Sequence, residues 1–244
     1  MIRKIFAMLF CVMLVLSGCD EEKSSKKMKI GISADYPPFE YYDNGELKGF
    51  EIDLARLVAK EMGKEAEFED MPFSSLLAAL QNGSLDAAIA SITSTPERRK
   101  NFDLSRCYYA ESIASMYMKN EPHRNPDEMI DSKVACQLGS TMEIWAKEKV
   151  TAAQLIAMDN VGQIVEALKA GQVDCVLLDN VQAQSFCDVN PGLAYNIVAK
   201  SDAGYAIVFK KQSDLREKIN VILKKLEQNG ELKKLMKKWR LPEE

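Results

Sequence analysis

Ala79-Leu80-Gln81-Asn82-Gly83-Ser84-Leu85-Asp86-Ala87 is echoed later in the chain by Ala167-Leu168-Lys169-Ala170-Gly171-Gln172-Val173-Asp174-Cys175. Each stretch contains the end of a predicted helix, a glycine that stops the helix, and the beginning of an apolar strand. One echo of this kind also arises from ordinary helix-to-strand punctuation. The sharper interpretation is that the chain contains two lobes with the same internal design.

Short apolar strands alternate with amphipathic helices around both stretches. This alternation predicts an α/β fold with mainly parallel sheets. Extended stretches at 113–119 and 205–210 are expected to carry the chain between the lobes. The remaining expected elements are strands at 29–33, 67–71 and 85–91, helices at 50–62 and 74–81, strand–helix units near 133–147 and 154–170, a strand at 173–178, and two helices that begin near Leu215 and Leu232.

The composition excludes several classes of protein. Of 244 residues, 47% are hydrophobic and 28% are charged, so the chain can bury a sizeable core. Its 32 basic and 36 acidic residues give a net charge of −4, which argues against a nucleic-acid partner. A single histidine, His123, argues against histidine-based catalysis and a multi-histidine metal site. No apolar run reaches the about 18 residues that a membrane-spanning helix needs.

The first residues have the pattern of an export signal. Arg3 and Lys4 precede the uncharged stretch 5–16. Leu16-Ser17-Gly18-Cys19 resembles the lipobox of bacterial lipoproteins, in which the cysteine is acylated and becomes the mature N-terminus. We therefore predict a lipoprotein signal peptide over 1–19, with lipidation at Cys19, and a polar tether over 20–27. The alternative is an ordinary signal in which Cys19 is incidental.

Four further cysteines follow this segment. None has the C-x-x-C spacing of a metal site, and their three alternative pairings cannot be separated by sequence. Two of them fall in predicted strands, where buried thiols are the default expectation. The four are Cys107, Cys136, Cys175 and Cys187, of which Cys136 and Cys175 lie in the strands.

Polar groups gather where the predicted strands end. After the strand at 85–91, Thr95 is a good N-cap and Pro96 a natural first helical residue. Arg98 then falls in the first turn, where the helix dipole disfavours a cation. A bound carboxylate or phosphate would compensate for that placement, whereas the alternative is a solvated basic run over 98–100.

Two other strand ends offer polar side chains. Gly139 follows one strand, and Ser140 with Glu143 matches a capping box, whose N–H groups could also face an anion. Asp179 follows the strand at 173–178, where it either caps the next helix or offers a carboxylate to an ammonium group.

Aromatic side chains accompany these groups. The turn at 35–39 could present Tyr36, and Phe73 begins a helix after Pro72. Aromatic rings at such positions usually pack in the hydrophobic core. A cation with N–H donors, an acid and two aromatic plates at strand ends nevertheless suit a zwitterion that carries a side chain.

Four motifs resemble those of the polar amino-acid substrate-binding proteins of ABC importers, which form family 3 of the bacterial extracellular solute-binding proteins. The resemblance covers Met28 to Trp239. It implies a two-lobed type II periplasmic-binding-protein fold with a ligand cleft, in which lobe 1 comprises 28–113 and 205–244 and lobe 2 comprises 114–204. The motifs are Asp35-Tyr36-Pro37-Pro38-Phe39-Glu40, Gly49-Phe50-Glu51-Ile52-Asp53-Leu54-Ala55, Ser91-Ile92-Thr93-Ser94-Thr95-Pro96-Glu97-Arg98 and Leu138-Gly139-Ser140-Thr141.

The resemblance also implies roles for individual residues. Arg98 would grip the ligand α-carboxylate, aided by N–H groups near Thr93 and Thr141. Thr93, a carbonyl near Ser91 and the Asp179 carboxylate would hold the α-ammonium group. Tyr36 and Phe73 would sandwich the side chain. The full set of expected ligand-binding residues is Ser33, Tyr36, Phe73, Ala90, Ser91, Thr93, Arg98, Gln137, Thr141 and Asp179.

Only a few of these residues decide which amino-acid side chain the pocket accepts. Many relatives have an acidic residue where this chain has Ser33, and that residue reads the ligand side chain. Asp35 could supply the missing charge and Gln137 a hydrogen bond, which favours arginine or lysine, with glutamine as the polar alternative. The counter-interpretation is that Asp35 points to solvent and leaves an uncharged pocket.

We therefore expect an exported, periplasmic or extracytoplasmic lipoprotein that captures a free amino acid by hinge closure. It would deliver the amino acid to the membrane subunits of an ABC permease. We expect a monomer without cofactor, metal or catalytic residues, held at the membrane by its N-terminal lipid. The alternatives are a cleft enzyme of the same fold, such as a cyclohexadienyl dehydratase, and the sensor module of a larger receptor.

Overall fold

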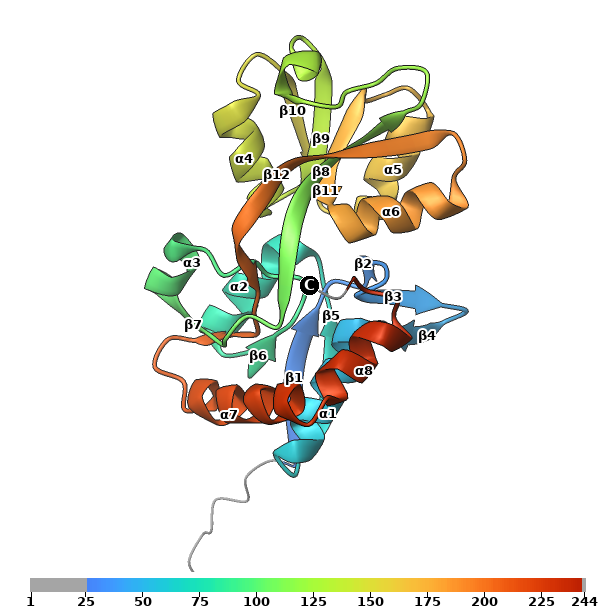
Figure 1. Ribbon diagram of the computed structural model, residues 1–244. Helices are drawn as coiled ribbons and strands as arrows, with labels where there is room; N and C mark the ends of the chain where they lie inside the picture. Colours follow the sequence, from blue (N-terminus) through green and yellow to red (C-terminus); the bar gives the residue numbers. More distant parts are fainter. Residues whose placement is uncertain (1–25, 243–244) are drawn as a thin grey trace, which may run out of the picture.

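Two five-stranded sheets, each flanked by helices, form two lobes joined by two long strands (Figure 1). The computed structural model describes residues 26–242, so the predicted signal peptide, the lipobox and most of the tether lie outside the described residues. The strand order is β5-β1-β6-β13-β7 in the first sheet and β10-β9-β11-β8-β12 in the second. The predicted α/β class is confirmed.

The first lobe is built around a sheet in which β1 pairs in parallel with β5 and β6, while β13 pairs antiparallel with β6 and β7. A small second sheet, β2-β3-β4, lies beside it. The strands are β1 (Lys27–Ile32), β2 (Asp35–Tyr36), β3 (Glu40–Asp43), β4 (Glu46–Lys48), β5 (Glu65–Asp70), β6 (Ala87–Ala88), β7 (Phe102–Leu104) and β13 (Val208–Lys210). The helices are α1 (Phe50–Glu61), α2 (Phe73–Asn82), α3 (Pro96–Asn101), α7 (Leu215–Gln228) and α8 (Glu231–Lys238).

The second lobe has three parallel strands, β10, β9 and β11, followed by β8, which is antiparallel to both β11 and β12. Its strands are β8 (Tyr109–Met118), β9 (Lys133–Gln137), β10 (Gln154–Met158), β11 (Cys175–Asp179) and β12 (Leu193–Tyr205). Its helices are α4 (Thr141–Lys149), α5 (Val161–Lys169), α6 (Asn180–Val189) and a 3-10 turn at Pro126–Met129.

The two strands that join the lobes are β8 and β12, which pair with each other from Tyr109–Tyr205 to Met118–Leu193. Of the stretches expected to connect the lobes, 113–119 already belongs to the second sheet, because β8 pairs with β11 from Ile113. The stretch 205–210 begins at the last residue of β12 and contains β13, which belongs to the first sheet. The two crossings therefore precede these stretches, at the start of β8 and the end of β12, and the expected bounds were wrong.

The predicted strand at 85–91 is also shorter than expected. Only Ala87 and Ala88 belong to the ladder, because β13 pairs with β6 at a single position and the chain turns at Ser91, whose φ is 49°. Its apolar residues are nonetheless buried, as their pattern predicted.

The two echoed stretches occupy equivalent places in the two lobes. Gly83 and Gly171 both follow a helix and have positive φ angles of 81° and 68°. Asp86 Oδ2 accepts a hydrogen bond from the backbone N–H of Lys29 (2.8 Å), and Asp174 Oδ2 accepts one from that of Lys133 (2.6 Å). Each aspartate thus ties the end of its glycine turn to the neighbouring parallel strand, as expected for two lobes of the same design.

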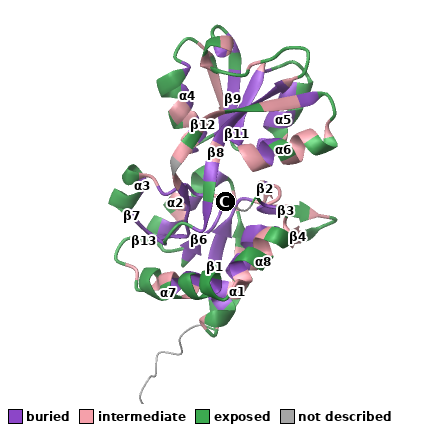
Figure 2. Ribbon diagram, viewed as in Figure 1, coloured by how far each residue is buried: buried purple, intermediate pink, exposed green. Residues whose placement is uncertain are grey.

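The strands of both sheets consist largely of buried residues, whereas the helices combine buried residues with exposed ones (Figure 2). Near the crossing strands, the rings of Phe39, Tyr109 and Tyr205 lie 5.2 to 5.7 Å apart. Gly49 lets α1 begin against this cluster: its φ is 138°, and a Cβ atom there would lie 1.9 Å from the Phe39 carbonyl oxygen.

Two of the cysteines are buried free thiols, as predicted for strand positions. Cys136 and Cys175 lie fully buried in β9 and β11, and burial raises the pKa of each thiol to about 12. Both are therefore protonated at neutral pH and poorly reactive.

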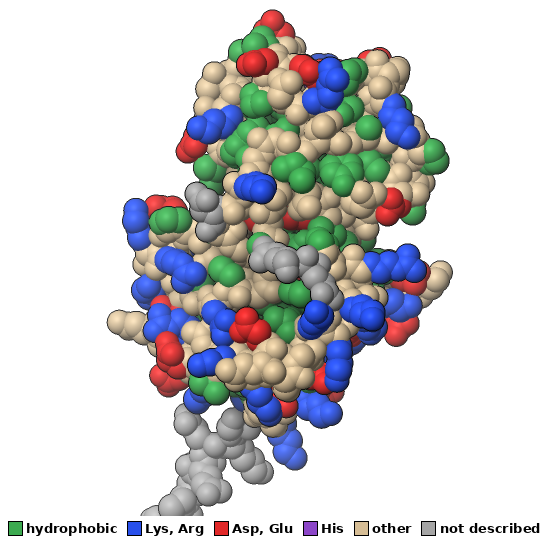
Figure 3. All heavy atoms as spheres, viewed as in Figure 1, with side chains coloured by type: hydrophobic (Ala, Val, Ile, Leu, Met, Phe, Trp, Pro, Cys, Tyr) green, Lys and Arg blue, Asp and Glu red, His purple; other side chains and the backbone are tan. Residues whose placement is uncertain are grey.

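The surface fits the nearly balanced charge of the chain. Basic and acidic side chains are interspersed on the face drawn in Figure 3. Between residues 26 and 242, no helix combines the length and apolar character needed to cross a bilayer.

The equivalence of Asp86 and Asp174 generates a stability prediction. Asp86→Ala and Asp174→Ala each remove the acceptor of one hydrogen bond from a backbone N–H, and each should lower the free energy of unfolding by about 1 kcal/mol in urea denaturation. Glu148→Ala, on the exposed face of α4, is the control and should have no measurable effect. A loss at only one of the two aspartates would show that the stretches are not equivalent.

Candidate functional site

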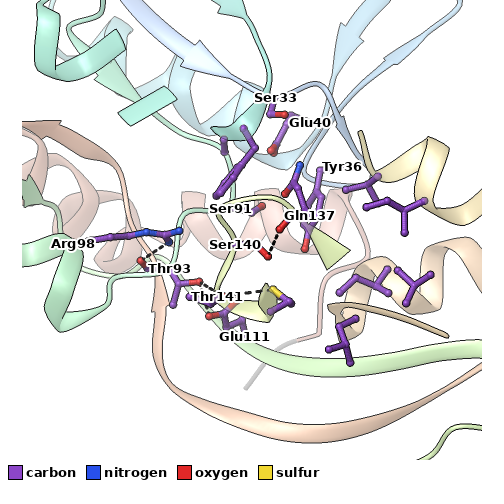
Figure 4. Close-up of a pocket in the computed structure, with 18 residues that line it drawn as sticks. Ser33, Tyr36, Glu40, Ser91, Thr93, Arg98, Glu111, Gln137, Ser140 and Thr141 are labelled. Carbon is purple, nitrogen blue, oxygen red and sulfur yellow. Dashed lines mark hydrogen bonds between the residues drawn. The ribbon is translucent and has the colours of Figure 1, made fainter. Parts of the chain in front are cut away.

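A pocket lies between the lobes, where strand ends and helix N-termini of both sheets meet (Figure 4). It contains nine of the ten residues expected from sequence: Ser33, Tyr36, Phe73, Ala90, Ser91, Thr93, Arg98, Gln137 and Thr141. The tenth, Asp179, adjoins it, because its backbone N–H donates to the Tyr36 hydroxyl at 3.3 Å. Segments far apart in sequence are thus brought together as expected.

Arg98 is placed by the cap that the sequence predicts. The Thr95 hydroxyl accepts from the backbone N–H of Arg98 (3.2 Å), with Pro96 as the first residue of α3. The Arg98 side chain is only 8% exposed, whereas Arg99 and Lys100 are exposed. The solvated-run alternative therefore applies to its neighbours and not to Arg98.

The Arg98 guanidinium is held by carbonyl groups of both lobes. Nη1 donates to the carbonyl of Thr93 (2.9 Å) and Nη2 to that of Gly139 (3.0 Å), and the guanidinium carbon lies 5.7 Å from the centre of the Phe73 ring. Burial lowers the pKa of Arg98 to about 10, so the group stays protonated at neutral pH. The nearby charge of Glu111 opposes this lowering, and the hydrogen bonds of the guanidinium go to neutral carbonyls, so this buried cation is suited to bind an anion.

Hydroxyl groups of the two lobes meet beside Arg98. Thr93 Oγ1, from the first lobe, lies 3.2 Å from Thr141 Oγ1, at the first turn of α4. The predicted cap of α4 is also present, since the Ser140 hydroxyl accepts from the backbone N–H of Glu143. Together with the Arg98–Gly139 bond, these contacts show that the lobes are closed around the pocket.

Asp179 combines the two roles that the sequence left open. Its Oδ1 accepts from the backbone N–H of Val181 (2.8 Å) and so caps α6. Its Oδ2 is buried and has no hydrogen-bond partner among residues 26–242. Burial raises the pKa of Asp179 to about 7. One oxygen is structural, and the other is left to accept a proton or a donor group from a ligand.

The opposite end of the pocket contains an acid that the sequence analysis did not assign. Glu40 lies beside Ser33 in Figure 4 and is 1% exposed, and its Oε2 has no hydrogen-bond partner in the described chain. Burial, followed by the charge of Glu51, raises the pKa of Glu40 well above its usual value. Glu40 belongs to a motif quoted for the resemblance, which was the signal that it faces a functional region.

The other pocket residues that the sequence analysis missed are mostly apolar or lie in elements read as core. Glu111 is the exception, because it is acidic, 4% exposed and located near the start of β8. Nothing in its local sequence marks it as a pocket residue. Ser140, which the sequence analysis singled out as a helix cap, also lines the pocket, and the remaining members are Met142, Val161, Ile164, Val176, Leu177 and Leu178.

Asp35 does not lie in the pocket, so the expectation that it supplies negative charge there was wrong. Its Oδ2 accepts from the backbone N–H of Val161 (2.7 Å), at the N-terminus of α5 in the other lobe. The alternative that it points to solvent is also wrong. Asp35 joins the two lobes at the lip of the cleft, where the Ser74 hydroxyl also donates to Asp159 Oδ1 (2.5 Å).

Comparison with known proteins places this geometry in a family. The model of the bacterial extracellular solute-binding proteins, family 3, matches residues 28–242. The arginine-binding extracellular protein ArtP of Bacillus subtilis is 34% identical over 239 residues, which cover 94% of each chain. The glutamine-binding protein GlnH of an ABC transporter of the same organism is 32% identical over 226 residues, which cover 89% of this chain and 82% of GlnH.

A solved structure agrees with both. The amino-acid ABC transporter substrate-binding protein AbpA of Streptococcus pneumoniae, bound to L-arginine, superposes with a TM-score of 0.83 at 33% identity, covering 88% of this chain and 94% of AbpA. The two-lobed α/β architecture, the pocket between the lobes and these relatives agree, and the chain belongs to family 3 of the bacterial extracellular solute-binding proteins.

Proposed function

We propose that this protein binds a polar amino acid between its lobes, with arginine favoured over lysine and then glutamine, and delivers it unchanged to an ABC importer. The observation that carries the proposal is the presence of buried groups of opposite charge that can each take a further partner. Arg98 is a protonated guanidinium whose hydrogen bonds go to neutral carbonyls, and Asp179 has one buried carboxylate oxygen without a donor. A zwitterion supplies both missing partners.

Side-chain selectivity follows from the acid at the far end of the pocket. Many relatives have an acidic residue at the position of Ser33, and in this chain Glu40, which lies beside Ser33, takes its place. The Oε2 atom of Glu40 is buried without a donor. A guanidinium has five N–H donors and a charge, and it also stacks on aromatic rings such as Tyr36 and Phe73. Glutamine is the weaker candidate, because its amide can donate to Glu40 without neutralising it. The relatives named for arginine and for glutamine support the same two ligands.

Hinge closure about β8 and β12 is the expected mechanism of capture. A ligand that contacts Arg98 and Thr93 from one lobe and Asp179 from the other interacts fully only with the closed state, so its binding shifts the population toward closure. The importer would then meet a monomeric, exported protein that is held at the membrane by a lipid on Cys19.

The Asp179→Asn variant should lose amino-acid affinity and gain stability at alkaline pH. Because folding raises the pKa of Asp179 to about 7, the folded protein binds more protons than the unfolded chain from pH 4 to 7, and stability falls as pH rises through this window. Asparagine retains the cap to Val181 without this cost. The ligand-free variant should be more stable than wild type by roughly 1–3 kcal/mol at pH 8, and equal at pH 4, in urea denaturation.

If Asp179→Asn is no more stable than wild type at pH 8, this account of the carboxylate is contradicted. Thr151→Asn is a neutral control in an exposed turn of the same lobe, and its pH profile should follow that of wild type.

Calorimetry with arginine, lysine, glutamine and glutamate tests the ligand. Arginine should bind most tightly, because its guanidinium brings both a charge and several donors to Glu40. Glu40→Gln should weaken arginine at least about tenfold, the equivalent of about 1.4 kcal/mol, and leave glutamine within about threefold.

Arg98→Ala is the matched comparison. Because this variant loses the contact with the α-carboxylate of the ligand, its binding of every amino acid should be weaker by about 2–5 kcal/mol. Tighter binding of glutamate or glutamine than of arginine would refute the cationic preference while leaving amino-acid binding intact.

The lipid anchor is tested by fractionation and mass spectrometry of the exported protein. Wild type should be found in the membrane fraction with an acylated mature N-terminus at Cys19, and Cys19→Ala should be soluble after export, because a single substitution removes the acylation site. A freely soluble wild type without lipid would exclude the anchor.

A further inference from the structure

Glu111 is a buried acid that the binding roles proposed above do not use. It lies near the start of β8, lines the pocket and is 4% exposed. Its Oε1 accepts a hydrogen bond from Thr93 Oγ1 at 2.6 Å, and its Oε2 has no hydrogen-bond partner within residues 26–242. The charged or titratable groups that interact with it are Arg98 from α3, Asp179 from β11, Tyr36 from β2 and Tyr205 from β12.

The contact with Glu111 decides what Thr93 can offer to a ligand. A threonine hydroxyl has one proton and two lone pairs. Because the proton is committed to a carboxylate at short distance, Thr93 Oγ1 turns only lone pairs toward its other neighbours. Thr141 Oγ1, 3.2 Å away, is then the donor in their contact, and it shares its proton with Met142 Sδ at 3.4 Å. The hydrogen bonds form a directed chain from Thr141 through Thr93 to Glu111.

We infer that Glu111 is a positioning residue for the selection of amino acids: it fixes the Thr93 hydroxyl as an acceptor that faces the ammonium group of the ligand. The inference rests on the proposed function, in which Thr93 and Asp179 hold that group. An ammonium has three protons, so it satisfies both acceptors at once. A 2-hydroxy acid has a single proton at the same place, so it satisfies one acceptor and leaves the other buried without a donor.

Without Glu111, Thr93 is free to turn. Its hydroxyl can then donate to the ligand hydroxyl, which in turn donates to Asp179. With a 2-hydroxy acid bound, every one of these groups then has a hydrogen-bond partner. Glu111 therefore acts on discrimination between ligands, through Thr93, without a contact of its own to the ligand. A merely structural residue would instead weaken both ligands by the same factor.

The experiment compares arginine with argininic acid, its 2-hydroxy analogue, by calorimetry. Wild type should prefer arginine strongly, and Glu111→Met, which keeps the side-chain volume, should reduce the ratio of the two dissociation constants at least about tenfold. In the Thr93→Val background, Glu111→Met should change that ratio by less than about twofold. An unchanged ratio in Glu111→Met, or an equal change in both backgrounds, would overturn the inference.

Thr93→Val alone gives a second readout with little risk to folding, since the two side chains have nearly the same shape. It should weaken arginine about tenfold and leave argininic acid within about twofold, because only the ammonium uses Thr93 as an acceptor. Equal weakening of both ligands would show that Thr93 donates, which contradicts the inference. If glutamine proves to be the ligand, its own 2-hydroxy analogue replaces argininic acid. Failure of wild type to bind any amino acid would refute the proposed function itself.

Discussion

The cleft edge of the first lobe depends on one buried carboxylate, that of Glu51 in the first turn of α1. It accepts both from the backbone N–H of Ser91, at 2.9 and 3.0 Å, and from the Ser91 hydroxyl at 3.3 Å, and it also accepts from the Tyr108 hydroxyl. Ser91 is thereby held in a left-handed conformation that a serine rarely adopts. Helix α1, the strand end and the beginning of the crossing strand are fixed to one another through a single side chain.

The pocket concentrates polar groups that the closed protein leaves without partners. One buried carboxylate oxygen of each of Glu40, Glu111 and Asp179 lacks a donor within residues 26–242, and the hydrogen bonds of the buried Arg98 guanidinium go to neutral carbonyls. Unpaired buried polar groups are costly, and in the proposed binding mode an amino acid satisfies those of Glu40 and Asp179. The raised pKa values of the carboxyl groups in the pocket express the same cost, since burial is their first cause in each case.

Much of this arrangement could be predicted from the sequence, because caps and strand ends are local. Thr95, Pro96 and Ser140 set helix starts through neighbouring residues alone, each at a strand end of its own sheet, and the closed lobes bring the two starts together. The roles of Glu40, Glu51 and Glu111 depend on long-range packing. An acid in a first helical turn reads as solvated, yet Glu51 is fully buried, and Glu111 enters the pocket only because β8 crosses between the lobes. Asp35 was misread for the same reason, since its partner is on the other lobe.

The lip contacts made by Asp35 and Ser74 have a consequence for the resting protein. Both bridge the lobes outside the pocket, so they stabilise the closed shape by the same amount whichever molecule is inside, or none. They raise the fraction of empty protein that is already closed, which increases apparent affinity because less free energy is spent on closure. The lip contacts therefore add to closure without adding to selectivity, which is left to the groups that line the pocket.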